Sequence, residues 1–336
     1  MDTLYSDVAN YKKLLKQYIE TQDEKSLYGA EQISKSFIKN KIPPEEIINL
    51  HIQALAELYP SLSEEMQHSM NFLLETMIAY GIAHQEFQAL REKQLELKSE
   101  IGVAAGMQEN LLATTKPIIE GLDIGVVSVP AHQMNGDYHH FIKGKDGSLG
   151  VAVADVVGKG VPAALCMSMI KYSMDSLPEE SMSPKAILEN LNRVVERNVD
   201  PSMFITMFYA QYLPSENKLR YSSAGHEPGF YYHKKEDRFE EIETKGLVLG
   251  VAADSNYHRY ERFVQNGDMI IILTDGVTEC RQGERFIETE EVLDVIKSYS
   301  HLSAQDMVDH VYKYFERMQN FELRDDFTLI ILRKEV

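Results

Sequence analysis

The sequence predicts an α+β protein in which an all-α helix bundle precedes a domain of antiparallel β-sheets covered by helices. Two observations support this prediction. Residues 1 to about 112 carry apolar side chains at steps of three and four, which is the spacing of amphipathic helices. After Pro117 the chain changes to short β-rich runs separated by Gly, Pro and Asn. These runs mostly follow one another directly, which favours antiparallel sheets over a regular βαβ alternation.

The amino-terminal region divides into four predicted helices with recognisable starts. Residues 43–46, Pro-Pro-Glu-Glu, place proline and acids in the first turn of one helix. Residues 61–65, Ser-Leu-Ser-Glu-Glu, open the next helix in the same way. No strong breaker follows until Leu112, so this last helix is expected to be unusually long.

The long helix contains a weak heptad seam. Its members alternate by three and four residues: Phe87, Leu90, Gln94, Leu97, Ile101, Ala104, Gln108 and Leu111. Two glutamines and one alanine at core positions weaken the seam. We expect a short parallel coiled coil that makes the protein a homodimer and joins its two halves; a solvent-exposed connecting helix is the alternative.

The second half is predicted to hold seven strand runs and about four helices. The helices are expected at roughly 161–177, 184–198, 288–298 and 303–319. The strand runs are residues 122–130, 147–156, 203–213, 218–225, 228–234, 267–276 and 325–336.

Composition excludes several classes of protein. The 336 residues suit two domains, and the formal charge of −18 argues against binding to nucleic acid or to an anionic membrane. The two cysteines, Cys166 and Cys280, lack the spacing of a zinc ribbon or a disulfide framework. Neither a signal peptide nor an apolar run of about 20 residues is visible, so a cytoplasmic protein is expected.

Aspartates stand at strand ends or beside glycine at four places in the second half. They are Gly136-Asp137, Asp155, Asp275-Gly276 and Asp325-Asp326. Each alone fits a turn. Taken together they indicate a site, because three of the four adjoin buried β runs, where an unpaired carboxylate is costly to bury. Mg²⁺ or Mn²⁺ is the expected counter-charge, since both prefer oxygen ligands.

Such a site predicts hydrolysis of a phosphate ester. Two divalent ions about 3.5–4 Å apart activate a water molecule and clamp a phosphoryl group for in-line attack. A cysteine phosphatase is excluded, because Tyr172 and Phe286 stand where the arginine of a C-x5-R loop is required. Neither a G-x-S-x-G elbow nor a P-loop is present. The Gly-Lys-Gly at 158–160 fits either a backbone approach to the metal or a tight turn before the next helix.

Seven motifs in order then resemble a known family. NGDYHHF, ADVVGKGVPAAL, FITMFYA, SSAGHEPGFYY, KGLVLGV, LTDGVTE and DDFTLIIL, over roughly residues 118–336, are similar to the bacterial SpoIIE-like branch of the metal-dependent type 2C serine/threonine phosphatases. IPPEEIINLH, LYPSLSEE and CMSMIKYSMDSLPE extend the resemblance to RsbU-type members of that branch over essentially the whole chain. The resemblance implies an α-β-β-α sandwich with two Mn²⁺ or Mg²⁺ ions in a cleft at one edge.

The resemblance also implies roles for individual residues. Asp155 corresponds to the ligand that bridges the two ions, and the carbonyl of Val156 to a ligand of the second ion. Asp275 and Asp325 would hold the first ion. Asp137 would act directly or through metal-bound water, and no side chain would be the nucleophile.

Other positions near these ligands leave alternatives open. Asp326 is expected beside the ligand Asp325, although the two assignments can exchange. His226 fits either a turn-stabilising residue or a general acid. The aromatic-aspartate pair that many relatives have after Gly-Asp is replaced here by Tyr138 and His139. Close passage of the backbone is expected at four glycines: Gly136, Gly158, Gly160 and Gly276.

The implied partners belong to a stress-signalling switch. The substrate would be phosphoserine on a small anti-anti-sigma protein (RsbV-like), whose dephosphorylation releases a general-stress sigma factor. The activator would be a kinase-like protein (RsbT-like) on the amino-terminal helices. The expected division is therefore a partner-binding or dimerisation domain at 1–84, a coiled-coil-like linker at 85–117 and a metal-dependent phosphatase domain at 118–336. A catalytically silent scaffold and a two-metal nuclease are the rival hypotheses.

Overall fold

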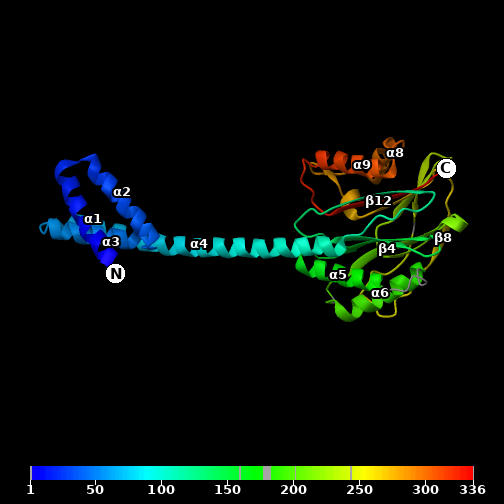
Figure 1. Ribbon diagram of the computed structural model, residues 1–336, viewed down its shortest axis with the longest axis horizontal. Coiled ribbons are helices and arrows are strands. Elements are labelled where there is room, and N and C mark those ends of the chain that lie inside the picture. Colours follow the sequence, from blue (N-terminus) through cyan, green and yellow to red (C-terminus); the bar gives the residue numbers. More distant parts are fainter. Residues whose placement is uncertain (1, 159, 177–182, 201, 243, 336) are drawn as a thin grey trace. The chain divides into compact units, whose positions relative to one another are not determined.

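The computed structural model describes residues 2–158, 160–176, 183–200, 202–242 and 244–335. Contacts between Cα atoms divide the chain into two compact units, one ending at Lys98 and the other beginning at Ser99 (Figure 1). The predicted three-part division at 84/85 and 117/118 stays a prediction.

The first unit is helical, as predicted. It comprises α1 (Asp2–Thr21), α2 (Glu24–Lys39), α3 (Pro44–Leu58) and the first part of α4 (Glu64–Leu112). Pro44 occupies the first turn of α3, and the Ser63 hydroxyl accepts the Met66 amide at 3.4 Å near the start of α4. The predicted helix starts are therefore confirmed.

The seam predicted on α4 has different surroundings along its length. Phe87, Leu90, Leu97 and Leu111 are exposed, whereas Ile101 and Ala104 are half-buried. Gln108 is only 4% exposed and hydrogen-bonds the backbone of its own chain at Asn135. The expectation that Gln108 occupies the core of an intermolecular seam is wrong, because this side chain is committed to the second unit.

Two five-stranded antiparallel sheets form the second unit. The first has the order β1 (Leu122–Val129), β12 (Phe327–Lys334), β9 (Met269–Leu273), β6 (Gly229–His233) and β7 (Arg238–Ile242). The second has the order β2 (Asp137–Lys143), β3 (Leu149–Val156), β4 (Ile205–Leu213), β5 (Lys218–Ala224) and β8 (Tyr260–Phe263).

Helices cover the outer faces of both sheets. α5 (Val161–Asp175) and α6 (Pro184–Asn198) pack on the second sheet, and α8 (Thr289–Ser298) and α9 (Ala304–Met318) pack on the first (Figure 1). These four helices and the α-β-β-α layering are confirmed. The sequence analysis did not predict β2, β7, β8, the short helix α7 (Asp275–Thr278) or the hairpin of β10 (Arg281–Gln282) and β11 (Arg285–Phe286).

Alternation along each strand separates three hydrophobic layers. In β9, Ile270 and Ile272 point between the sheets, whereas Ile271 and Leu273 pack under α8 and α9. Complete burial of such a side chain stabilises the fold by about 1.5–3 kcal/mol. β9 is therefore a core strand buried on both faces, which explains its uninterrupted apolar sequence.

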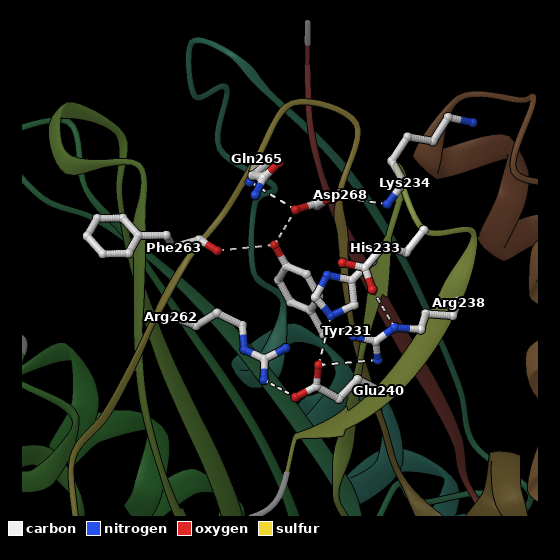
Figure 2. A network of polar contacts seen from close by, with 10 residues as sticks. Tyr231, His233, Lys234, Arg238, Glu240, Arg262, Phe263, Gln265 and Asp268 are labelled. Atoms are coloured by element: carbon white, nitrogen blue, oxygen red, sulfur yellow. Dashed lines mark hydrogen bonds and ion pairs between the residues drawn. The ribbon is translucent and has the colours of Figure 1, made fainter.

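A polar network joins the sheets near β6 and β8 (Figure 2). The buried Asp268 carboxylate accepts the Tyr231 hydroxyl, the Lys234 amide at 2.9 Å and the Gln265 amide at 2.9 Å. The Arg262 guanidinium lies 4.6 Å from the centroid of the Tyr231 ring and pairs with Glu240. The network fixes β8 of one sheet against β6 and β7 of the other.

We predict that Asp268→Ala lowers the free energy of unfolding of the second unit by about 3 kcal/mol, because three donors lose their acceptor. Tyr231→Phe, which removes a single hydroxyl, should lower it by about 1 kcal/mol. Urea unfolding followed by circular dichroism measures both. Equal losses for the two variants would contradict the central role of Asp268.

Candidate active site

Asp137 and Asp155 lie opposite each other at one end of the second sheet. They are partners in the antiparallel register of β2 and β3, at the first residue of one strand and near the last of the other. The neighbouring sheet presents Asp275 two residues after the end of β9 and Asp325 two residues before the start of β12, and these two strands also pair. The topology therefore delivers the predicted acids to one edge of the sandwich.

A hydrogen bond joins the two sheets at this acidic edge. The Thr274 hydroxyl, at the end of β9, donates to the Asp137 carboxylate over 2.7 Å. The same Thr274 oxygen accepts the Thr328 amide of β12 at 3.2 Å. Asp137 is only 3% exposed, so its carboxylate lies behind the surface of the site.

Two glycines allow the acidic segments to approach closely. A Cβ atom on Gly276 would lie 2.0 Å from the Asp326 carbonyl oxygen, so any side chain there would push the two loops apart. A Cβ on Gly136 would lie 3.1 Å from the Asp326 Oδ2 and 3.6 Å from the Asp155 Oδ1. The positions of Gly136 and Gly276 agree with the expectation of close backbone passage.

Asp325 and Asp326 have different surroundings. The Asp326 carboxylate accepts the Ala131 amide at 2.7 Å and the Gly136 amide at 2.5 Å, which fixes the loop between β1 and β2. The Asp325 side chain is exposed, and its Oδ1 accepts the Asp326 amide at 3.0 Å. This geometry favours Asp325 as the residue free to bind a ligand.

Burial and mutual repulsion destabilise the ionised form of the clustered aspartates. Burial, together with the nearby charges of Asp275, Asp325 and Asp326, raises the pKa of Asp155 to about 7. Burial also raises the pKa of Asp275 to about 6, with Asp325 adding to the shift. The pKa of Asp137 is raised well above its usual range, mainly by burial. A divalent cation would relieve this repulsion.

The donor set fits a hard divalent cation. A cleft of about 520 Å³ is lined by carboxylates, main-chain groups and the loop between β1 and β2; its members include Gln133, Gly136, Asp155, Val156, Gly158, Gly160, Asp325 and Asp326. Oxygen donors of this kind suit Mg²⁺ or Mn²⁺. Within the described residues, no three His, Cys, Asp or Glu side chains are already arranged around a single ion position.

The glycines after β3 have backbone angles that favour glycine. Gly158 has a φ of +132° and Gly160 a φ of +75°, and Gly160 directly precedes α5. Both line the cleft beside Val156. These angles agree with a turn before α5, while the backbone approach to a metal stays a prediction; Lys159, between the two glycines, lies outside the described residues.

His226 is a structural residue. Its Nε2 donates to the Leu273 carbonyl at 3.2 Å, so its Nδ1 accepts from the Thr206 hydroxyl at 2.8 Å. Burial lowers the pKa of the ring to about 4, which keeps it neutral. Because both ring nitrogens are engaged, His226 links β4 to the end of β9 and matches the turn-stabilising alternative.

The residues that hold the acids in place were not predicted from the sequence. Thr274 precedes Asp275, and Asn135 precedes Gly136, so both stand inside motifs that were read for their aspartates alone. Gln108 was assigned to the seam. Its neighbours in the sequence give no signal that it contacts residue 135.

Comparisons with known proteins agree with this architecture. Residues 145–335 match the family described as "Stage II sporulation protein E (SpoIIE)", and residues 9–83 match "Phosphoserine phosphatase RsbU, N-terminal domain". The "SiaA-PP2C domain of Pseudomonas aeruginosa" has a TM-score of 0.61 at 16% identity, over 72% of this chain and 98% of that one. The RsbU and RsbW domains of Rv1364c from Mycobacterium tuberculosis have a TM-score of 0.57 at 24% identity, over 66% of this chain and 63% of that one.

The fold and the SpoIIE match therefore define a protein phosphatase of the type 2C class. A relative from Bacillus subtilis (strain 168), "Phosphoserine phosphatase RsbU", is 54% identical over 326 residues, which cover 97% of each chain. The chain belongs to the RsbU family of phosphoserine phosphatases.

We predict that the metal-free protein loses stability as the pH rises. The folded-state pKa of Asp155 is raised to about 7 from a reference of 3.8, so its contribution is fully present below about pH 4 and is lost as the pH rises through about 7. Asp155→Asn removes this penalty. In the presence of a chelator, its midpoint at pH 8 should exceed that of the wild type by at least about 2 °C in scanning calorimetry.

The difference between the two proteins should shrink as the pH falls toward 4. Identical pH profiles for the wild type and Asp155→Asn would show that the carboxylate is not repelled in the folded state.

Proposed function

We propose that the chain uses two Mn²⁺ or Mg²⁺ ions at its acidic edge to hydrolyse phosphoserine on an anti-anti-sigma protein (RsbV-like). The observation that carries this proposal is the convergence of Asp137, Asp155, Asp275 and Asp325 from both sheets onto one edge. Burial and mutual repulsion hold two of these carboxyls at raised pKa values, as expected of a site built for added positive charge.

Each residue has a distinct proposed role. Asp155 would contribute to holding both ions, the Val156 carbonyl would serve the second, and Asp275 and Asp325 would serve the first. Asp137 would contribute to metal binding directly or through a water molecule. Its burial and the hydrogen bond from Thr274, which hold the carboxylate beneath the surface of the site, support this role. When bound, the ions supply activated water and neutralise phosphate charge.

The surroundings support hydrolysis without a protein nucleophile. Cys166 and Cys280 are buried, and burial raises the pKa values of both thiols. His226 has both nitrogens engaged. The loop amides held by Asp326 fix the rim of the cleft, so that substrate would meet the carboxylates and the main chain.

We propose that the first unit receives an RsbT-like activator and contributes to a homodimer. Its helices bury few side chains among the described residues, Ile33, Phe37 and Ala54 being the apolar ones. Phe72 and Tyr80, two turns apart on α4, are 76% and 59% exposed. Exposed aromatic side chains at helical spacing suit a protein partner.

The remaining proposals concern location. The formal charge of −18 and the two free cysteines support a cytoplasmic protein that binds neither nucleic acid nor membrane. In the described part of the chain, no helix is both long and apolar enough to cross a membrane.

Asp155→Asn and Asp275→Asn should each abolish Mn²⁺-dependent release of phosphate from the phosphorylated anti-anti-sigma protein. Each change removes one ligand charge while keeping the side-chain volume, and the rate loss is expected to exceed about 100-fold. Wild-type activity in both variants would reject the assignment. A wild-type chain that binds the partner but neither Mn²⁺ nor Mg²⁺ would support the scaffold hypothesis.

The activator should bind the exposed aromatic face of α4. The double change Phe72→Ser and Tyr80→Ser is expected to reduce stimulation by the RsbT-like protein at least about 10-fold while leaving the unstimulated rate unchanged. The matched control is Phe263→Ser, since Phe263 is 69% exposed on β8. Stimulation is measured as phosphate release across an activator titration; equal stimulation of all three proteins would place the activator elsewhere.

A further inference from the structure

A side chain in the last turns of α4 hydrogen-bonds the loop that leads into Asp137. The Gln108 side chain donates from Nε2 to the Asn135 carbonyl at 2.6 Å and accepts the Asn135 amide on Oε1 at 3.0 Å. Both polar groups of one buried amide are thus satisfied by one residue. Two bonds to the main chain of the same residue restrain the two peptide groups on either side of its Cα atom.

Hydrogen bonds continue from Asn135 to the acidic edge. The Asn135 Oδ1 accepts the Asp137 amide at 2.9 Å, and its Nδ2 donates to the Ser128 hydroxyl at 3.4 Å. Ser128 in turn contacts the Thr328 hydroxyl at 2.9 Å. The Thr328 amide donates to Thr274, which holds the Asp137 carboxylate. Asp137 is therefore restrained at its amide from one side and at its carboxylate from the other.

A hollow lies beside the contact between Gln108 and Asn135. A hollow of about 710 Å³ lies between α4 and the loop, lined on the helix side by small residues that include Gly102, Ala105 and Gly106. Ile101, about two turns before Gln108, lines the acidic cleft. Among the described residues of α4, Gln108 supplies the hydrogen bonds to this loop, so the helix holds Asn135 through a narrow contact.

We propose that Gln108 is a positioning residue for the acidic site. It sets the backbone of Asn135, and through it the placement of Gly136 and Asp137 relative to Asp155. Gln108 lines the hollow beside α4 and not the acidic cleft, so it would act through Asn135 and not by contact with substrate or metal. The inference rests on the proposed function, because it requires that Asp137 contributes to metal binding.

The test compares Gln108→Leu with Asn110→Leu in the full-length chain. Asn110 is exposed and bonds to the Gly106 carbonyl of its own helix, so its replacement controls for a leucine in the same turns. Mn²⁺ binding is measured by calorimetry, and backbone mobility by hydrogen exchange of a peptide covering residues 131–138. Gln108→Leu should weaken Mn²⁺ binding about 10–100-fold and speed the exchange, whereas Asn110→Leu should change neither.

The kinetic signature separates positioning from a general loss of structure. With saturating Mn²⁺, Gln108→Leu should recover most of the wild-type kcat at an unchanged KM for the phosphoprotein. If Gln108→Leu does not fold, Gln108→Met, which fills a similar volume without either bond, takes its place. Unchanged Mn²⁺ affinity and exchange in a folded Gln108 variant would overturn the inference while the wild type still binds Mn²⁺. Absence of Mn²⁺ binding by the wild type would overturn the proposed function and this inference together.

Discussion

Repulsion among the carboxylates at one edge of the sandwich is the constraint on which the site depends. Three of the acids are held by contacts that do not neutralise them: Thr274 donates to Asp137, two loop amides donate to Asp326, and Gly276 lets Asp275 approach residues 325–326. These contacts fix geometry and leave the charge in excess. The fold thereby stores an unfavourable interaction that either protonation or a bound cation would relieve, at the expense of stability in the metal-free state above about pH 7.

The network around Glu240 shows how basic neighbours change the pKa of a carboxyl group in this fold. Glu240 accepts from Arg262 and His233, and these bonds lower its pKa to about 2, whereas burial and like charges raise the pKa of Asp155 to about 7. Both groups are carboxylates on a sheet of the same sandwich. Basic side chains of the protein surround the Glu240 carboxylate, as Figure 2 shows, whereas under the proposed function the Asp155 carboxylate would receive its cation from solution.

The sequence predicted what depends on local pattern. Helix starts at Pro44 and Glu64 and the doubly buried β9 follow from capping chemistry and hydrophobic spacing, and the acids were found because charge beside a buried run is costly. It did not predict β8, whose Tyr-Glu-Arg-Phe alternation is too short to stand out. Nor could it find Gln108, because an amide on a helix has the same local pattern whether it faces solvent or a loop 27 residues away.

The pairing of β12 between β1 and β9 has a consequence for the order in which the protein is made. Asp325 and the strand β12 that follows it are synthesised after Asp137, Asp155 and Asp275, so a nascent chain that has reached only α7 presents three of the four acids and lacks the strand that joins β1 to β9. The site can form only when segments some 190 residues apart have met. Catalytic competence would thus act as a check on completed synthesis, and interrupted chains of this phosphatase would release no phosphate.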